Sequence, residues 1–195
     1  MPSSLGSPRR AAAALIAVVV ALALAVPLPA RAASPSAVTA DGIVLTIGDR
    51  IVYVGGGVLE EPSATVTGYR GPRGTAVTIP AIVRYEGFDV PVHAIGDGAF
   101  RYAGLTGVTI PDGVVRIGEG AFAENSLGQG VVIPASVTEI GKRAFAGLRG
   151  DVMFEGNAPR MPSANEQPLG DGRGWGTQGT LVRFYEGAAG FATPT

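Results

Sequence analysis

Two short apolar patterns recur along the middle of the chain. The first is Val-x-Ile-Pro, which occurs at 77–80, 108–111 and 131–134. Its apolar residues lie at i and i+2 and so point to one face of a short strand, and its proline, which lacks an N–H, ends that strand. The second is Ile-Gly-x-x-Ala-Phe, which begins at Ile95, Ile117 and Ile140. Here we expect the glycine to permit a turn and x-x-Ala-Phe to form one helical turn.

The spacing of these patterns predicts a solenoid. The second pattern repeats after 22 and 23 residues, and the first after 31 and 23. Fixed periods in the twenties are typical of stacked coils. No single coil buries enough apolar surface to fold alone, so the coils are stable only as a stack. Coils about 4.8 Å apart align like side chains in an aromatic column (Phe100, Phe122, Phe145) and an aliphatic column (Ile95, Ile117, Ile140).

The chain before the regular repeats predicts strands that cap the stack. The first coil is longer than the later ones. The alternation of residues 83–90, with Glu86-Gly87 at its centre, predicts a β-hairpin built into that coil. Upstream we expect a further strand at 64–68 and a second hairpin, in which a type II′ turn at Gly48-Asp49 joins strands at 43–47 and 50–54.

The chain after the repeats predicts a closing region. Residues 152–154 take the place of a fourth Val-x-Ile strand, residues 159–179 are rich in Gly and Pro and predict a loop, and residues 181–185 predict a final strand. The whole chain is therefore expected to comprise a signal peptide at 1–32, a flexible linker at 33–40, capping strands at 41–76, repeats at 77–154, and a C-terminal loop and capping strand at 155–195.

The N-terminal segment has the features of a secretory signal peptide. Arg9-Arg10 is followed by an uninterrupted apolar run at 11–26, and Ala30-Arg31-Ala32 supplies the small-x-small pattern for cleavage between Ala32 and Ala33. As a helix the run spans about 24 Å, short of a bilayer core of about 30 Å. We expect general secretory export to the outside or the cell surface, with membrane contact only through this transient leader. An uncleaved anchor is the alternative.

Composition excludes several functional classes. The chain has no cysteine, which excludes disulfides, thiolate metal sites and Cys nucleophiles. It carries 15 Lys and Arg against 16 Asp and Glu, and the arginines are scattered singly, without the clustered basic face that binds nucleic acid. Removal of the leader leaves 12 basic and 16 acidic residues. The pattern indicates no metal, no cofactor and no nucleic-acid partner.

The repeat resembles the BspA-type leucine-rich repeats of bacterial and protist surface proteins. The resemblance rests on Val-Thr-Ile-Pro followed by Val-x-x-Ile-Gly-x-x-Ala-Phe, with Asn125 and Leu127 as the Asn-x-Leu ending of the middle unit. It implies a mainly β, right-handed leucine-rich-repeat solenoid of about three coils with short helical turns, capped by β-hairpins. It also implies an exported protein that serves in adhesion or in binding to a host or matrix component.

The candidates for chemistry are few. His93 is the single histidine, and no nucleophile motif accompanies it, so catalysis at His93 is disfavoured. Equivalent repeat positions hold Asp97, Glu119 and Lys142, and a second set holds Ala94, Arg116 and Glu139. Of these, Arg116 and Glu139 are expected to form an exposed ion pair across coils.

Arg149-Gly150-Asp151 matches a tripeptide read by integrin-type receptors, although a chance match is the simpler explanation. Gly170, Gly172, Gly174 and Gly176 lack the ending of a phosphate loop, and Trp175 is either a tether for that loop or an exposed contact.

The outward residues of the first strand of each coil are the candidate ligand face: Thr78, Thr109, Val132 and Met153. The leading hypothesis is a non-catalytic binding or adhesion module for a protein or matrix component. A structural envelope or matrix spacer without a specific ligand is the alternative, and a hydrolase is a third reading that the residues disfavour.

Overall fold

The computed structural model describes residues 35–54, 57–160, 181–184 and 189. By its contacts the chain divides into two units, Met1–Ala33 and Ser34–Thr195. The predicted leader and its cleavage site between Ala32 and Ala33 lie outside the described residues. Every element described below belongs to the second unit.

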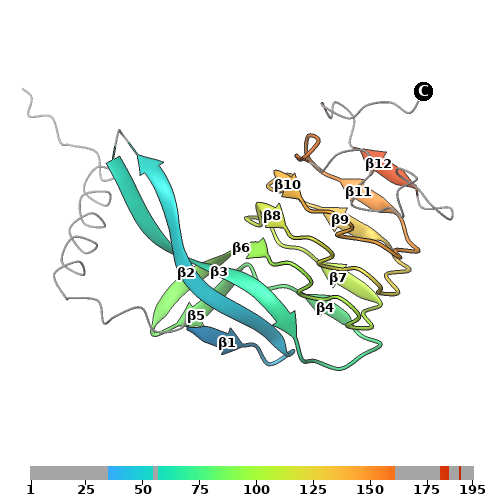
Figure 1. The fold of residues 1–195 in the computed structure, drawn as a ribbon, viewed down its shortest axis with the longest axis horizontal. Helices are drawn as coiled ribbons and strands as arrows, with labels where there is room; N and C mark the ends of the chain where they lie inside the picture. The colour runs from blue at the N-terminus through green and yellow to red at the C-terminus, as the bar shows by residue number, and fades with distance from the viewer. Residues whose placement is uncertain (1–34, 55–56, 161–180, 185–188, 190–195) are drawn as a thin grey trace, which may run out of the picture. The chain divides into compact units, whose positions relative to one another are not determined.

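A long hairpin opens the second unit. β2 (Ile43–Val54) pairs antiparallel with β3 (Gly57–Tyr69), and β1 (Ser36–Val38) pairs antiparallel with β2. β3 then pairs in parallel with β6 (Phe88–Ile95) around Ala64 and Val66, so the hairpin is continuous with the first coil (Figure 1). The inward residues Ile43, Leu45 and Ile47 alternate with partly exposed ones, as a half-buried strand requires.

Two predictions for this region are wrong. Residues 36–38 lie in the predicted linker, yet they form β1, with Ser36 opposite Thr46. Gly48-Asp49 is not a turn, because β2 continues through it with Gly48 opposite Ser63. The ladder runs on to Val54, which pairs with Gly57, and a longer ladder satisfies more backbone groups. The strand predicted at 64–68 lies within β3 and is confirmed.

The hairpin predicted within the first coil is confirmed. β5 (Ile82–Tyr85) pairs antiparallel with the start of β6, with Val83 opposite Val90. Glu86 and Gly87 both have positive φ, 49° and 87°, which fits a two-residue type I′ turn.

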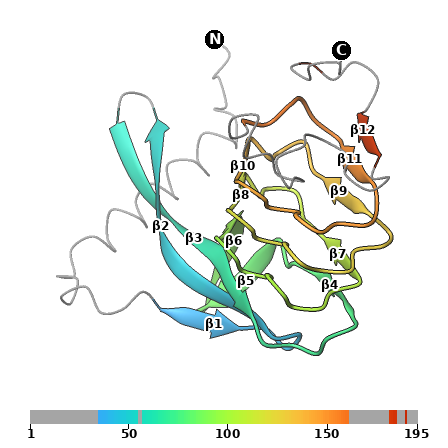
Figure 2. The same cartoon turned by 45° about the vertical axis from the view of Figure 1, so that its right-hand side comes forward.

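Each later coil contributes two short strands, which stack in parallel rows (Figures 1 and 2). The second strands form one row, β6, β8 (Arg116–Ile117) and β10 (Glu139–Ile140). The first strands form two sheets: β4 (Ala76–Thr78) with β7 (Gly107–Thr109), and β9 (Val131–Ile133) with β11 (Val152–Phe154) and β12 (Val182–Phe184). The predicted final strand is thus β12, and it extends the row of first strands. The stacked coils confirm the mainly β solenoid.

The predicted side-chain columns fill the core. The rings of Phe100 and Phe122 are stacked, with centroids 5.2 Å apart, and those of Phe122 and Phe145 are stacked at 5.3 Å. Tyr69 of the capping hairpin continues this column with a tilted ring 5.7 Å from that of Phe100. The three isoleucines of the aliphatic column are also buried. Burial of each large apolar side chain contributes about 1.5–3 kcal/mol.

The segment after each second strand forms hydrogen-bonded turns instead of a helical turn. In the first coil Arg101 N–H donates to Gly98 O at 3.0 Å, and Ala103 N–H donates to Phe100 O at 3.1 Å. The same segment also bonds to the next coil, since Phe100 N–H donates to Ala121 O at 2.7 Å. Positive φ values at Gly98 (62°) and Tyr102 (56°) are incompatible with a right-handed helix, and the described part of the chain contains no helix.

The glycine after each of the three isoleucines serves close packing. A Cβ on Gly118 would lie 2.6 Å from Asp97 N, and one on Gly141 would lie 2.5 Å from Glu119 N. Neither glycine has a positive φ. The expectation that this glycine permits a turn is therefore wrong: the adjacent coil's backbone passes too close for a side chain, and the turn itself relies on later positions such as Gly98.

Candidate functional site

The outward face of the first-strand row carries two columns of side chains. The first column holds the outward residue between the two apolar residues of each strand pattern, and its predicted members are all exposed: Thr78, Thr109, Val132 and Met153. Strand register adds Arg183 to this column, opposite Met153. The second column lies two residues earlier along the chain in each coil and consists of Ala76, Gly107, Gly130, Asp151 and Leu181.

A groove with a volume of about 420 Å³ lies between and beside these columns. Three positions of the second column, Ala76, Gly107 and Gly130, carry at most a methyl group, and they leave a hollow beside the taller side chains of the first column. Thr109, Val132 and Met153 line the groove, whereas Thr78 is not among its lining residues. The lining among the described residues consists of Ala76, Gly107, Val108, Thr109, Gln129, Gly130, Val131, Val132, Asp151, Met153 and Arg183.

The groove crosses a break in the strand row. β7 and β9 belong to different sheets, although both lie along the same side of the stack (Figure 2). The connection that leads into the third coil is one residue longer than the connection that leads into the second. Three residues lie between Leu127 and Val131, and two lie between Leu105 and Val108. The extra residue is taken up in a turn at Gly128-Gln129, closed by a 3.1 Å hydrogen bond from Gly130 N–H to Leu127 O.

A polar clasp closes one end of the groove. The Oδ2 atom of Asp151 lies 3.3 Å from Nε of Arg183, and its Oδ1 atom accepts a 3.2 Å hydrogen bond from Leu181 N–H. The side chains are 42% and 57% exposed, so solvent screens this ion pair and its contribution is below about 1 kcal/mol. Sequence reasoning missed Arg183 and the whole second column. The alternation rule would have found the second column, two residues before each member of the first, whereas Arg183 joins the first column only through the pairing of β11 with β12.

The Arg149-Gly150-Asp151 tripeptide is not presented as an exposed turn. Gly150 is buried, and a Cβ there would lie 2.6 Å from the Cα of Gly130. The Asp151 carboxylate is already bound in the clasp. A receptor that reads the tripeptide needs that carboxylate, so the geometry favours the chance match.

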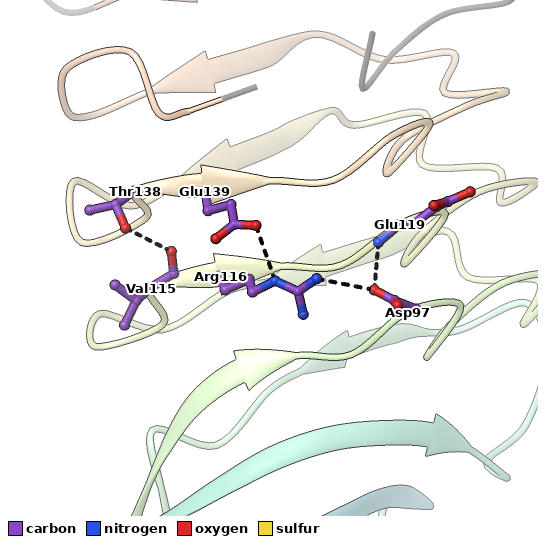
Figure 3. A network of polar contacts seen from close by, with 6 residues as sticks. All are labelled: Asp97, Val115, Arg116, Glu119, Thr138 and Glu139. Carbon is purple, nitrogen blue, oxygen red and sulfur yellow. Dashed lines mark hydrogen bonds and ion pairs between the residues drawn. The ribbon is translucent and has the colours of Figure 1, made fainter. Parts of the chain in front are cut away.

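A second group of charges lies on the row of second strands (Figure 3). The predicted pair of Arg116 and Glu139 is confirmed, with Nε 3.3 Å from Oε1, and Nη2 of Arg116 also lies 3.6 Å from Oδ1 of Asp97. That Asp97 oxygen accepts a 2.8 Å hydrogen bond from Glu119 N–H. These side chains are 46% to 65% exposed, so they form a surface network that adds at most about 1 kcal/mol per pair.

This network lines a polar pocket of about 270 Å³. Its described lining carries three acidic and three basic side chains, and the complete set is Asp97, Arg116, Glu119, Glu139, Ile140, Gly141, Lys142 and Arg160. The alternating signs neutralise each other along the coils.

His93 lies on β6, half-buried, and its backbone carbonyl accepts a 2.9 Å hydrogen bond from Val115 N–H in the next coil. Among the described residues, no group of three or more His, Asp or Glu side chains is placed to hold a metal ion. Among the described residues no helix is present that could cross a membrane. The glycine series at 170–176 and Trp175 lie outside the described residues.

The stacked coils, the paired strand rows and the periodic Val-x-Ile-Pro and Ile-Gly-x-x-Ala-Phe motifs define a leucine-rich repeat protein. Residues 91–150 match the family model described as "BspA type Leucine rich repeat region (6 copies)". The resemblance inferred from the sequence is confirmed over these residues.

A solved leucine-rich repeat protein from Bacteroides capillosus ATCC 29799 is similar to this chain. The two are 25% identical, the match covers 75% of this chain and 96% of that one, and the TM-score is 0.47. No curated protein matches the chain.

Proposed function

We propose that this protein is an exported, non-catalytic binding module whose groove recognises a protein or matrix component. The observation that carries the proposal is the coincidence of a hollow with exposed apolar side chains. Val132 and Met153 are 48% and 37% exposed, and both line the groove. Contiguous apolar side chains beside a concavity are typical of interaction sites on soluble proteins.

The rest of the proposal rests on the sequence and on the repeat class. The leader at 1–32, with cleavage between Ala32 and Ala33, supports export. Leucine-rich repeats mediate protein–protein interaction, which supports a protein partner. The proposal of a non-catalytic role rests on the lone His93 without an accompanying nucleophile motif.

The structure provides a matched set of variants to test the groove. Thr109→Glu and Val132→Glu each place a charge in the groove, whereas Thr78→Glu makes the same change in the same column outside it. We expect binding to a panel of immobilised matrix and cell-envelope proteins to be lost in the first two variants and kept in the third. If the protein is only a spacer, neither the parent protein nor any variant should bind a member of the panel specifically. If all three variants bind as well as the parent, the interface lies outside the groove.

Export and the absence of catalysis are tested separately. N-terminal sequencing of the protein expressed from the full sequence in a bacterial host should begin at Ala33. A protein that keeps residues 1–32 would instead be anchored by them. A turnover screen on hydrolase substrates should show no activity that His93→Ala removes.

A further inference from the structure

We infer that the groove takes an extended peptide that places an aliphatic side chain against Val132 and Met153 and a carboxylate on Arg183. This inference rests on the proposed binding function and names the chemistry of the partner. It is carried by the width of the hollow, the nature of its lining and the hydrogen-bonding capacity of the clasp.

The width of the hollow fits an extended backbone. Residues of both outward columns line the hollow, and adjacent outward columns on a strand are about 7 Å apart. A helix with its side chains measures about 10–12 Å across and does not enter such a space. Gly107 and Gly130 line the hollow with backbone atoms alone, although a Cβ on Gly130 would meet the backbone of Asp151 in the next coil.

The lining favours an aliphatic side chain. Val108, Val132 and Met153 supply apolar surface, and methionine adapts its shape to different neighbours. None of the described lining residues is aromatic, so these residues offer no ring face on which a sugar or a base would stack. Its two described charges, Asp151 and Arg183, are paired with each other and have no excess positive charge for a nucleic acid.

The guanidinium of Arg183 has N–H donors that the bond to Asp151 does not use. Both oxygens of Asp151 are engaged, one by Leu181 N–H and one by Arg183 Nε. The guanidinium of an arginine has five N–H donors, and within residues 35–54, 57–160 and 181–184 that of Arg183 donates through Nε alone. Its terminal nitrogens can therefore hold a carboxylate in the two-pronged geometry that arginine favours, whereas a cationic ligand would find the Asp151 oxygens occupied.

The spacing of the strands sets the distance between the two ligand groups. Val132, Met153 and Arg183 are opposite one another on adjacent strands, so the point midway between Val132 and Met153 lies about 7 Å from Arg183. Residues i and i+2 of an extended peptide are also about 7 Å apart and point to the same side. The motif that fits is an aliphatic residue followed two positions later by Asp, Glu or a chain-terminal carboxylate.

The test uses fluorescence anisotropy on protein expressed from the full sequence, with three labelled probes that differ at one residue. The probes contain Leu-Ser-Glu, Leu-Ser-Gln or Leu-Ser-Lys between flanking glycines. We expect the Glu probe to bind roughly fivefold tighter than the Gln probe, as for an exposed charge-assisted contact, and the Lys probe to bind no better than the Gln probe.

Variants separate this inference from the proposed function. In Arg183→Gln the Glu and Gln probes should bind equally, in Val132→Glu all three should weaken, and in Thr78→Glu nothing should change. Circular dichroism of each variant checks that it is folded. Equal binding of the Glu and Gln probes to the parent protein, tighter binding of the Lys probe, or no binding at millimolar concentration overturns the inference. If a matrix protein still binds in a Val132-sensitive manner, the proposed function survives that result.

Discussion

The side-chain carbonyl of Asn125 accepts a 2.9 Å hydrogen bond from the backbone N–H of Leu105, one coil earlier in the stack. Its amide nitrogen donates to Phe100 O at 2.7 Å and to Phe122 O at 2.9 Å. Asn125 is 5% exposed and is the single buried polar residue in the described core. One side chain thus forms hydrogen bonds with the backbone N–H and C=O groups of two coils, in the turns that lie outside the strand ladders.

Removal of this side chain should be costly. Asn125→Ala leaves the Leu105 N–H and two carbonyls buried without that partner, and we expect a loss of about 2–4 kcal/mol in the free energy of unfolding. Urea denaturation followed by circular dichroism measures it. Ser126→Ala, at an exposed neighbour, should change stability by less than about 0.5 kcal/mol. Equal effects of the two substitutions would mean that the asparagine does not join the coils.

The aromatic column should respond as a packed core. Phe122 is stacked between Phe100 and Phe145, so Phe122→Ala opens a cavity and should cost about 3–5 kcal/mol. Phe88, at the tip of the β5–β6 hairpin, is 69% exposed, and Phe88→Ala should stay within about 0.5 kcal/mol. Thermal unfolding of both variants gives the comparison, and a small effect at Phe122 would contradict the stacked arrangement.

Replacing the residue at one left-handed backbone position in the third coil should raise the stability of the protein. Arg143 has a φ of 50° at the repeat position where the earlier coils place Gly98 (62°) and Gly120 (58°). Arg143→Gly should relieve that strain and stabilise the protein by about 1 kcal/mol, which raises the Tm by about 2–4 °C. Gly120→Ala, whose new Cβ meets nothing closer than 3.9 Å, should lower the Tm through φ alone. Scanning calorimetry tests the signs, and a fall in Tm for Arg143→Gly would refute the strain argument.

Close packing of the coils should make Gly118 irreplaceable. In Gly118→Ala the new methyl group would overlap the backbone of Asp97, and we expect a loss above about 2 kcal/mol. Gly48 has no atom within 4 Å of an added Cβ and no positive φ, so Gly48→Ala should be neutral or slightly stabilising. Chemical denaturation of the Gly118→Ala and Gly48→Ala variants is the measurement. A loss of stability in the first alone shows that the close contact with the neighbouring coil is the cause, and not a general sensitivity of glycine positions to substitution.

Periodic apolar positions predicted the stack well because burial alone decides them. The spacing of Phe100, Phe122 and Phe145 was enough to place their rings in one column. The Glu86-Gly87 turn was predicted for a similar reason, since strands on both sides alternate about a single short connection. Patterns that bury apolar residues at a fixed interval have one packing solution, and the sequence states the interval.

Local turn chemistry was less reliable. Gly48-Asp49 has the composition of a turn, yet the register between β2 and β3 runs straight through it. That register pairs Gly48 with Ser63 and Asp49 with Pro62, 15 and 13 positions away, and a local motif does not represent such partners. The reason for the glycine at position 118 was also hidden, because the atoms that exclude a side chain there belong to the preceding coil.

The candidate site was predicted in part. The outward column through Val132 and Met153 followed from alternation along each strand. The hollow beside it did not, because it arises from small residues in the neighbouring column and from one extra residue near Gly128. Arg183 was missed because some thirty residues separate its strand from Met153, the residue opposite it, and only pairing in the fold brings them together.

The break between β7 and β9 has a consequence for how this kind of protein diversifies. The coils remain joined across it by the second-strand row and by the turns, where for example Phe122 N–H bonds to Ala144 O at 2.7 Å. The face that carries the groove is therefore a side of the stack that tolerates an inserted or deleted residue. Relatives that differ by one residue at this place would keep the same stack while opening, narrowing or erasing the groove.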